Sequence, residues 1–178
     1  MSVCSYSDDR KTMVKAMVSW VLLAVAIIAL DLFTKHYAST HLVYGDPVPV
    51  VSFFNLTLLH NTGAAFSFLA DAGGWQKWFF AAIAISVSGV LLVWMSRTPN
   101  KLWWLKLSQA FIIAGALGNL HDRLVHGYVV DFISLYYGQY YFPAFNIADM
   151  AITGGAILLL VDSLFLESAR KKREEGMA

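Results

Sequence analysis

The sequence predicts an all-α integral membrane protein with four transmembrane helices and a small β-sheet and hairpin at the outer surface. Composition is the first reason: of 178 residues, 58% are hydrophobic, and the mean hydropathy is +0.57. Soluble domains contain only ~45 to 50% apolar residues. The second reason is that four apolar stretches approach the ~20 residues required to cross ~30 Å of hydrocarbon. Residues 1–178 are therefore expected to form one integral membrane domain.

The four predicted spans contain no internal proline, so each is expected to be a continuous helix. They cover about residues 14–36, 75–95, 102–120 and 146–166. Two longer segments, 37–74 and 121–145, are expected to form the outer loops.

The orientation follows from the positions of the basic residues, because cytoplasmic loops are enriched in Lys and Arg. Three of the 13 basic residues, Lys35, Lys77 and Arg123, fall on the predicted outer side. The other ten fall in the N-terminal tail, the link between the second and third spans, and the C-terminal tail. Both termini are therefore expected in the cytoplasm.

Net charge argues against a nucleic-acid-binding protein, and cysteine content excludes two kinds of structural site. A net charge of +1 provides no overall field that would attract nucleic acid. The single cysteine, Cys4, permits no intramolecular disulfide and no cysteine-based metal site.

The outer loops contain strand and turn signals. Residues 54–58 alternate apolar and polar side chains, which predicts a strand, and Asn61-Thr62-Gly63 predicts a turn. Residues 64–69 are apolar enough to lie in the membrane interface. In the second loop, Gly138-Gln139 lies amid aromatic residues and predicts the turn of a hairpin.

Polar residues inside predicted spans have structural and functional interpretations, because buried charges are costly unless paired or used. Asp31 and Lys35 have the i, i+4 spacing of a helical ion pair. Asp162 is expected to pair with Arg170 or to extend toward the surface. A lone histidine, His121, lacks a second histidine at helical spacing and does not indicate a metal site.

Small residues repeat every four positions in the third span, at Ala110, Ala114 and Gly118. Such spacing allows helices to approach closely, so this face is expected to pack against another helix. Asn119 then places an amide at the end of that packing face.

Two aspartates, Asp131 and Asp149, flank the aromatic hairpin of the second loop. The turn lies near their midpoint, so the hairpin is expected to bring their carboxylates together. Such a pair suits acid and base catalysis. The alternative is structural, with one aspartate capping the fourth span and the other paired with Arg123.

Five sequence blocks, in order, resemble bacterial lipoprotein signal peptidases (type II signal peptidases), and with the spans they cover most of residues 14–166. The blocks are Asp31-Leu-Phe-Thr-Lys35, Asn61-Thr-Gly-Ala-Ala-Phe66, Gly115-Ala-Leu-Gly-Asn-Leu-His-Asp-Arg123, Val129-Val-Asp-Phe132 and Phe145-Asn-Ile-Ala-Asp149.

This resemblance implies a membrane aspartyl endopeptidase that removes signal peptides from diacylglyceryl-modified prolipoproteins, cutting on the N-terminal side of the lipidated cysteine. It implies the bacterial inner membrane as location, with the active site toward the periplasm, and membrane lipid as a partner. The catalytic pair falls on Asp131 and Asp149, and no metal or organic cofactor is expected. Positions that shape or support the site fall on Asp31, Lys35, Asn61, Gly63, Asn119, Arg123 and Asn146.

Two other classes of function remain alternatives at this point. A small proton- or cation-coupled transporter would use the same aspartates as a conduction path. A non-catalytic assembly factor would use the sheet and the small-residue face to bind partners. The sequence determines neither the substrate repertoire, nor the oligomeric state, nor which aspartate is the base, because coupled carboxylates titrate as a unit.

Overall fold

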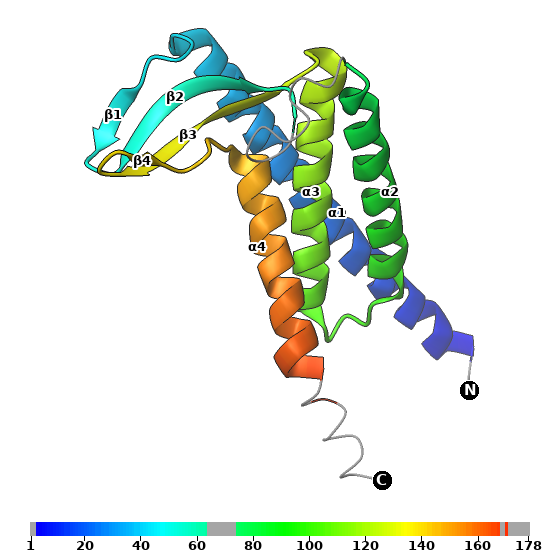
Figure 1. The fold of residues 1–178 in the computed structure, drawn as a ribbon. Coiled ribbons are helices and arrows are strands. Elements are labelled where there is room, and N and C mark those ends of the chain that lie inside the picture. Colours follow the sequence, from blue (N-terminus) through cyan, green and yellow to red (C-terminus); the bar gives the residue numbers. More distant parts are fainter. Residues whose placement is uncertain (1–2, 64–73, 168–169, 171–178) are drawn as a thin grey trace.

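The computed structural model describes residues 3–63, 74–167 and 170, which form a bundle of helices with a sheet at one end (Figure 1). The chain is mostly helical. The helices are α1 (Val3–His41), α2 (Gln76–Arg97), α3 (Trp103–Val125) and α4 (Ile147–Val161), and a short π-helix, η2 (Asp162–Leu166), follows α4. The first residues of α1 and the last of α4 lie at the end of the bundle opposite the sheet (Figure 1).

Three helical segments are long and apolar enough to cross a membrane, namely Met17–His41, Gln76–Arg97 and Ile147–Leu166. They correspond to the first, second and fourth predicted spans. Helix α3 has 23 residues but is not among these segments. Its polar residues Lys106, Gln109 and Asn119 are buried. These side chains therefore face neighbouring protein rather than lipid.

Two helices continue beyond the predicted spans, into the segments predicted as outer loops. Helix α1 continues to His41, and α3 continues to Val125, so residues 37–41 and 121–125 are helical. Hydropathy marks where apolar side chains stop, whereas a helix continues while its backbone hydrogen bonds are satisfied. Asp122 and Arg123 therefore lie on a helix and not in a loop.

The small-residue face of α3 packs closely, as predicted. Ala110 and Ala114 are fully buried. A β-carbon added at Gly115 would collide with the backbone carbonyl of Ala148, at the start of α4. One added at Gly118 would lie 2.7 Å from a carboxylate oxygen of Asp31 on α1. Glycine at these positions lets α3 contact both helices.

The sheet is antiparallel, with its four strands in sequence order. The strands are β1 (Val48–Val51), β2 (Phe54–Asn61), β3 (Val129–Tyr137) and β4 (Tyr140–Tyr141). The predicted strand at 54–58 is confirmed and extends to Asn61. The expected turn follows, with the backbone N–H of Gly63 donating to Asn61 Oδ1 at 3.0 Å. Residues 64–69, for which an interfacial segment was predicted, lie outside the described residues.

The predicted hairpin is confirmed, but its second strand is short. Gly138 has a φ of +60°, a conformation that glycine adopts readily. Strand β4 contains only two residues. The chain is held against β3 a second time where Ile133 and Phe145 exchange two backbone hydrogen bonds, of 2.9 and 3.1 Å. This second contact directs the chain into α4.

At the opposite end of the bundle, Asp162 and Arg170 form the pair that the sequence predicted. The guanidinium donates to both carboxylate oxygens, at 2.7 and 2.9 Å. This bidentate contact lies at the far end of α4 from Asp149.

Candidate active site

The first turn of α4 is closed by a capping box formed by Asn146 and Asp149. The backbone N–H of Asp149 donates to Asn146 Oδ1 at 2.9 Å, and the backbone N–H of Asn146 donates to Asp149 Oδ2 at 3.2 Å. Each side chain thus satisfies a backbone donor that the helix leaves free. The helix cap fixes the Asp149 carboxylate beside the end of the sheet.

Asp131 lies on β3 and is held by two amide donors. Asn146 Nδ2 donates to Asp131 Oδ1 at 2.7 Å, and Asn61 Nδ2, from the neighbouring strand, donates to Oδ2 at 3.2 Å. Only 3% of Asp131 is exposed. Since Asn146 contacts both aspartates, it joins the two carboxylates in one network.

The pKa of Asp131 is raised to about 7, chiefly because burial penalises its charged form and secondly because of the negative charge of Asp149. The hydrogen bonds from Asn61 and Asn146 oppose this shift. Near neutral pH, Asp131 therefore exchanges a proton readily, which is the property required of an acid or base catalyst.

Lys35 is almost completely buried and is connected to Asp149 through Asn119. Its ammonium forms ion pairs with Asp31 at 2.7 Å and with Asp122 at 3.1 Å, and it donates to Asn119 Oδ1 at 2.9 Å. The opposite end of that amide, Asn119 Nδ2, donates to Asp149 Oδ1 at 2.7 Å. Lys35 thereby fixes the orientation of the amide that contacts Asp149.

The two acidic partners of Lys35 also hold the backbone of the site. Asp31 Oδ1 accepts a hydrogen bond from the backbone N–H of Ala148 at 2.8 Å. Asp122 Oδ2 accepts one from the backbone N–H of Val130 at 3.1 Å. Ala148 and Val130 immediately precede Asp149 and Asp131 in the sequence, so both backbone segments are tied to one ion cluster.

Arg123 connects the site to the loop that follows β2. Its guanidinium donates to the backbone carbonyl of Gly63 at 2.9 Å and to that of Asn119 at 3.4 Å. The group lies 4.9 Å from the centre of the Phe80 ring, a cation–π distance. Its Nε has no hydrogen-bond partner among the described residues.

The network opens into a cavity of about 1580 Å³. The polar part of its wall includes Asp131, Asp149 and Arg123. The remainder is mostly apolar and comes from the sheet and from α2, α3 and α4, with Phe80, Ile83, Val87, Ile112, Phe142 and Ile157 among its residues. The carboxylates therefore lie in the same cavity as an extended apolar wall.

All nine residues predicted from the sequence as catalytic or supporting lie in this connected network. The cap of α4 is Asn146, so the structural alternative in which an aspartate is the N-cap is not what the structure shows, although Asp149 completes the capping box. Arg123 forms no ion pair with a carboxylate among the described residues. His121 is about half exposed, and its Nδ1 lies 3.6 Å from Asp122 Oδ1.

Asp122 is the residue of the network that sequence reasoning missed. It was assigned to a loop, where an aspartate is unremarkable. The available signal was its helical spacing, since Asp122 follows Asn119 by three residues and Gly118 by four and so shares their buried face.

The chain is similar to several known proteins. A family model described as signal peptidase (SPase) II matches residues 23–165. A lipoprotein signal peptidase of Acinetobacter baumannii is 58% identical over 157 residues, which are 88% of this chain and 89% of that protein. One of Teredinibacter turnerae is 52% identical and covers 88% of this chain and 93% of its own length.

Similarity extends to solved structures. A bacterial membrane enzyme determined by the in meso method at 2.3 Å resolution is similar with a TM-score of 0.75 and 34% sequence identity. The similarity covers 86% of this chain and 91% of that enzyme. The comparisons do not support the alternative of a small transporter.

Proposed function

This chain belongs to the lipoprotein signal peptidase (signal peptidase II) family of bacterial membrane enzymes, aspartic-type peptidases that cleave signal peptides from prolipoproteins, and we propose that Asp131 and Asp149 perform the cleavage in it. The observation that carries this proposal is Asn146, which is hydrogen-bonded to both carboxylates at the wall of the large cavity.

The mechanism follows from the chemistry of two neighbouring carboxylates that share one proton. The ionised carboxylate takes a proton from a water molecule as the water oxygen attacks the scissile carbonyl carbon. The protonated carboxylate donates a hydrogen bond to the carbonyl oxygen, on which negative charge develops. Collapse of the tetrahedral intermediate breaks the C–N bond, and a carboxyl proton passes to the leaving amine. These steps require no metal or organic cofactor.

The supporting residues have separate roles in this proposal. Asn61, Asn119 and Asn146 donate to the carboxylates and keep their oxygens in place, as preorganised donors do in other enzymes. Arg123 fixes the carbonyl of Gly63 and provides positive charge at the cavity wall. Asp31 and Lys35 position the backbone and the Asn119 amide.

The substrate in this proposal is a prolipoprotein whose cysteine carries diacylglycerol, cut on the N-terminal side of that cysteine. The apolar wall formed by Ile83, Val87 and Ile157 supports this choice, since it continues from the carboxylates along the helices. Each buried CH2 group of an acyl chain contributes about 0.8 kcal/mol. Membrane lipid is therefore part of the environment in which the substrate is recognised.

The proposed topology has four spans in the bacterial inner membrane, with both termini in the cytoplasm and the sheet on the periplasmic side. Two observations support it. Ten of the 13 basic residues flank the ends of the helices that lie away from the sheet. The start of α1 and the end of α4 both lie at that end of the bundle (Figure 1).

The decisive experiment incubates the purified protein with lipidated and unlipidated forms of one prolipoprotein and follows loss of the signal peptide on a gel. Cleavage of the lipidated form alone is the expected result. Equal cleavage of both forms would remove the diacylglyceryl group from the recognition element. Absence of cleavage in both would contradict the peptidase mechanism.

A further inference from the structure

One end of the sheet carries a group of exposed apolar side chains that the proposed mechanism does not use. At this end β1 turns into β2, and β3 turns into β4. The two turns are adjacent, because the backbone N–H of Tyr136 donates to the carbonyl of Phe53 at 3.0 Å. The group is named here the aromatic tip and consists of Val51, Phe53, Tyr137, Tyr140 and Tyr141.

The aromatic tip is strongly exposed and uncharged. Tyr137 is 87% exposed and Tyr140 is 83% exposed. The segments on both sides of the turns, 47–57 and 132–145, contain no Asp, Glu, Lys, Arg or His. Contiguous apolar surface of this kind marks a site of contact with another protein or with a membrane.

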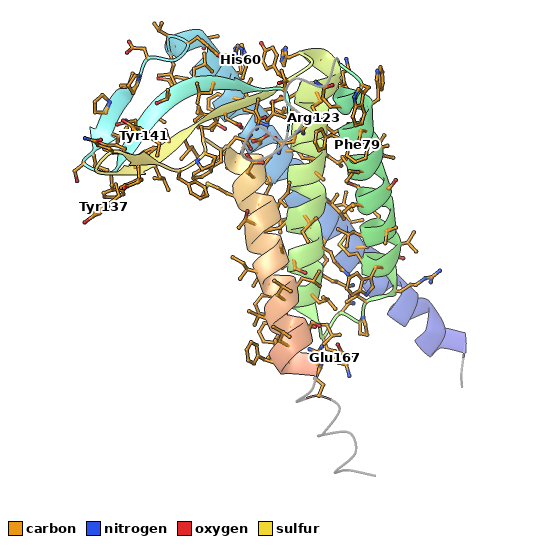
Figure 2. All side chains as sticks on the ribbon, in the orientation of Figure 1. His60, Phe79, Arg123, Tyr137, Tyr141 and Glu167 are labelled. Carbon is orange, nitrogen blue, oxygen red and sulfur yellow. The ribbon has the colours of Figure 1, made fainter. Side chains whose placement is uncertain are left out.

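The position of the aromatic tip favours contact with a membrane over contact with another protein. The sheet projects sideways from the bundle past α4, and in this view its tip lies at about the height of the first turn of α4, below the sheet-side ends of α2 and α3 (Figure 1). Figure 2 shows Tyr137 pointing away from the sheet at this tip. Because the helices cross the membrane along their length, a sheet that projects from their ends at this level lies over lipid.

Exposed apolar side chains also occur between the aromatic tip and α4 and on α4 itself. Phe142, which follows β4, is 59% exposed, and Met150 and Ile157 of α4 are 52% and 55% exposed. Phe142 and Met150 both border the large cavity. Apolar side chains are therefore exposed at the aromatic tip, directly after β4 and on α4.

We propose that the aromatic tip inserts into the headgroup region of the lipid bilayer and anchors the sheet to the membrane. Tyrosine is suited to this region, since its ring favours the apolar side of the interface and its hydroxyl remains hydrated. Strand β3 carries both Tyr137 and Asp131. The anchor thus fixes the depth of Asp131 relative to the lipid from which a lipidated substrate arrives. The inference rests on the proposed topology but not on catalysis.

The test uses the full-length protein with Cys4→Ser as background and the environment-sensitive fluorophore NBD on a single new cysteine, in vesicles of phosphatidylethanolamine and phosphatidylglycerol. Gln139→Cys places the probe between Tyr137 and Tyr140. His126→Cys, an exposed position at the end of α3, is the matched control. Quenching by spin labels at shallow and deep positions of the lipid is compared with quenching by aqueous iodide.

The probe at residue 139 is expected to be quenched more by shallow than by deep lipid labels and to be protected from iodide. The probe at residue 126 is expected to show the reverse preference for iodide. Adding Tyr137→Ser and Tyr140→Ser should restore iodide quenching at residue 139. If iodide quenched the probe at residue 139 while Tyr137 and Tyr140 were intact, the tip would lie in water and the proposal would be overturned. Protection from both lipid labels and iodide would indicate a protein contact and would overturn it as well. Neither reading depends on whether the protein cleaves a substrate.

Discussion

The carboxylates of Asp31 and Asp122 share one ammonium group, that of Lys35, and each also binds a backbone N–H next to an aspartate of the site. The two backbone segments come from β3 and from α4. Their relative position is therefore determined by a single buried ion cluster, and its central cation is the residue on which the arrangement most depends.

Lys35→Met should destabilise the protein, because it leaves two carboxylates buried without their cation. Removing one partner of a buried ion pair costs roughly 3 to 5 kcal/mol. Cleavage should fall as well, since Asn119 loses the donor that orients it. Thermal unfolding in detergent measures the first effect. Lys77→Met is the control: Lys77 is at the surface, with its ammonium 3.5 Å from the Leu124 carbonyl, and its loss should leave the melting temperature almost unchanged.

Asp131→Asn and Asp149→Asn should each reduce cleavage of lipidated substrate by at least about 100-fold, because an amide keeps the shape of the side chain but supplies no acid or base. The double variant should be no slower than either single variant, since the pair acts as one unit. The measurement is initial cleavage rate at equal amounts of folded protein. Asp162→Asn, at the other end of α4, should remain active. Near-normal cleavage by either single variant would return these aspartates to a purely structural role.

The cleavage rate should fall as pH rises through about 7. Burial and the charge of Asp149 raise the pKa of Asp131 to about 7, so the proton that the pair requires is lost above this value. Initial rates between pH 5 and pH 9 on lipidated substrate test this expectation. A rate that continued to increase up to pH 9 would be incompatible with a shared proton on this pair.

The same pKa shift predicts how stability depends on pH. In the unfolded chain an aspartate loses its proton near pH 4, whereas folded Asp131 keeps it up to about 7. Between these values the folded state binds more protons, so the free energy of unfolding decreases as pH rises. Asp131→Asn should flatten this slope, and denaturant unfolding at pH 5 and pH 7 compares the two proteins.

Gly115→Ala should separate α3 from α4, because the new β-carbon would collide with the carbonyl of Ala148. Overpacking of this kind costs about 1 to 3 kcal/mol and here displaces the start of α4. Gly89→Ala is a matched control, since nothing lies within 4 Å of its β-carbon position. The control should leave stability unchanged or raise it slightly. Thermal unfolding and cleavage should both distinguish the two variants.

Reporter fusions test the proposed topology. Fusions after Arg97 and after Arg173 should report the cytoplasm, because basic residues flank these helix ends. Fusions near Gly45 and Gly138 should report the outer side. A cytoplasmic signal at Gly138 would contradict four crossings.

Local patterns in the sequence predicted several contacts of the site. The i, i+4 spacing of Asp31 and Lys35 predicted their ion pair, and Gly138-Gln139 predicted the hairpin turn. Both contacts depend on residues close in the chain, for which spacing and turn chemistry suffice.

Contacts between segments far apart in the sequence could not be predicted from sequence patterns. The bond from the Ala148 backbone to Asp31 joins residues 117 positions apart, and no periodicity encodes such a contact. Strand β1 was also missed, because Pro47 and Pro49 argue against a strand in general. An edge strand tolerates proline, since one side of it needs no donor.

Helix caps show how one residue type can mislead. Aspartate is a favoured N-cap, and the structural alternative gave that role to one of the two aspartates, yet Asn146 occupies it and Asp149 lies three residues on. The capping box requires both residues and thus leaves the Asp149 carboxylate at the site.

The contact between Asp31 and Ala148 also bears on the timing of synthesis. A ribosome delivers α1 to the membrane long before α4, so Asp31 and Lys35 enter the bilayer without the segment that they later hold. During that interval the ion pair between Asp31 and Lys35 is the contact that α1 itself provides for their charges. A chain that ends before α4 lacks both Asp149 and the backbone N–H that Asp31 binds, so it contains only one aspartate of the proposed pair.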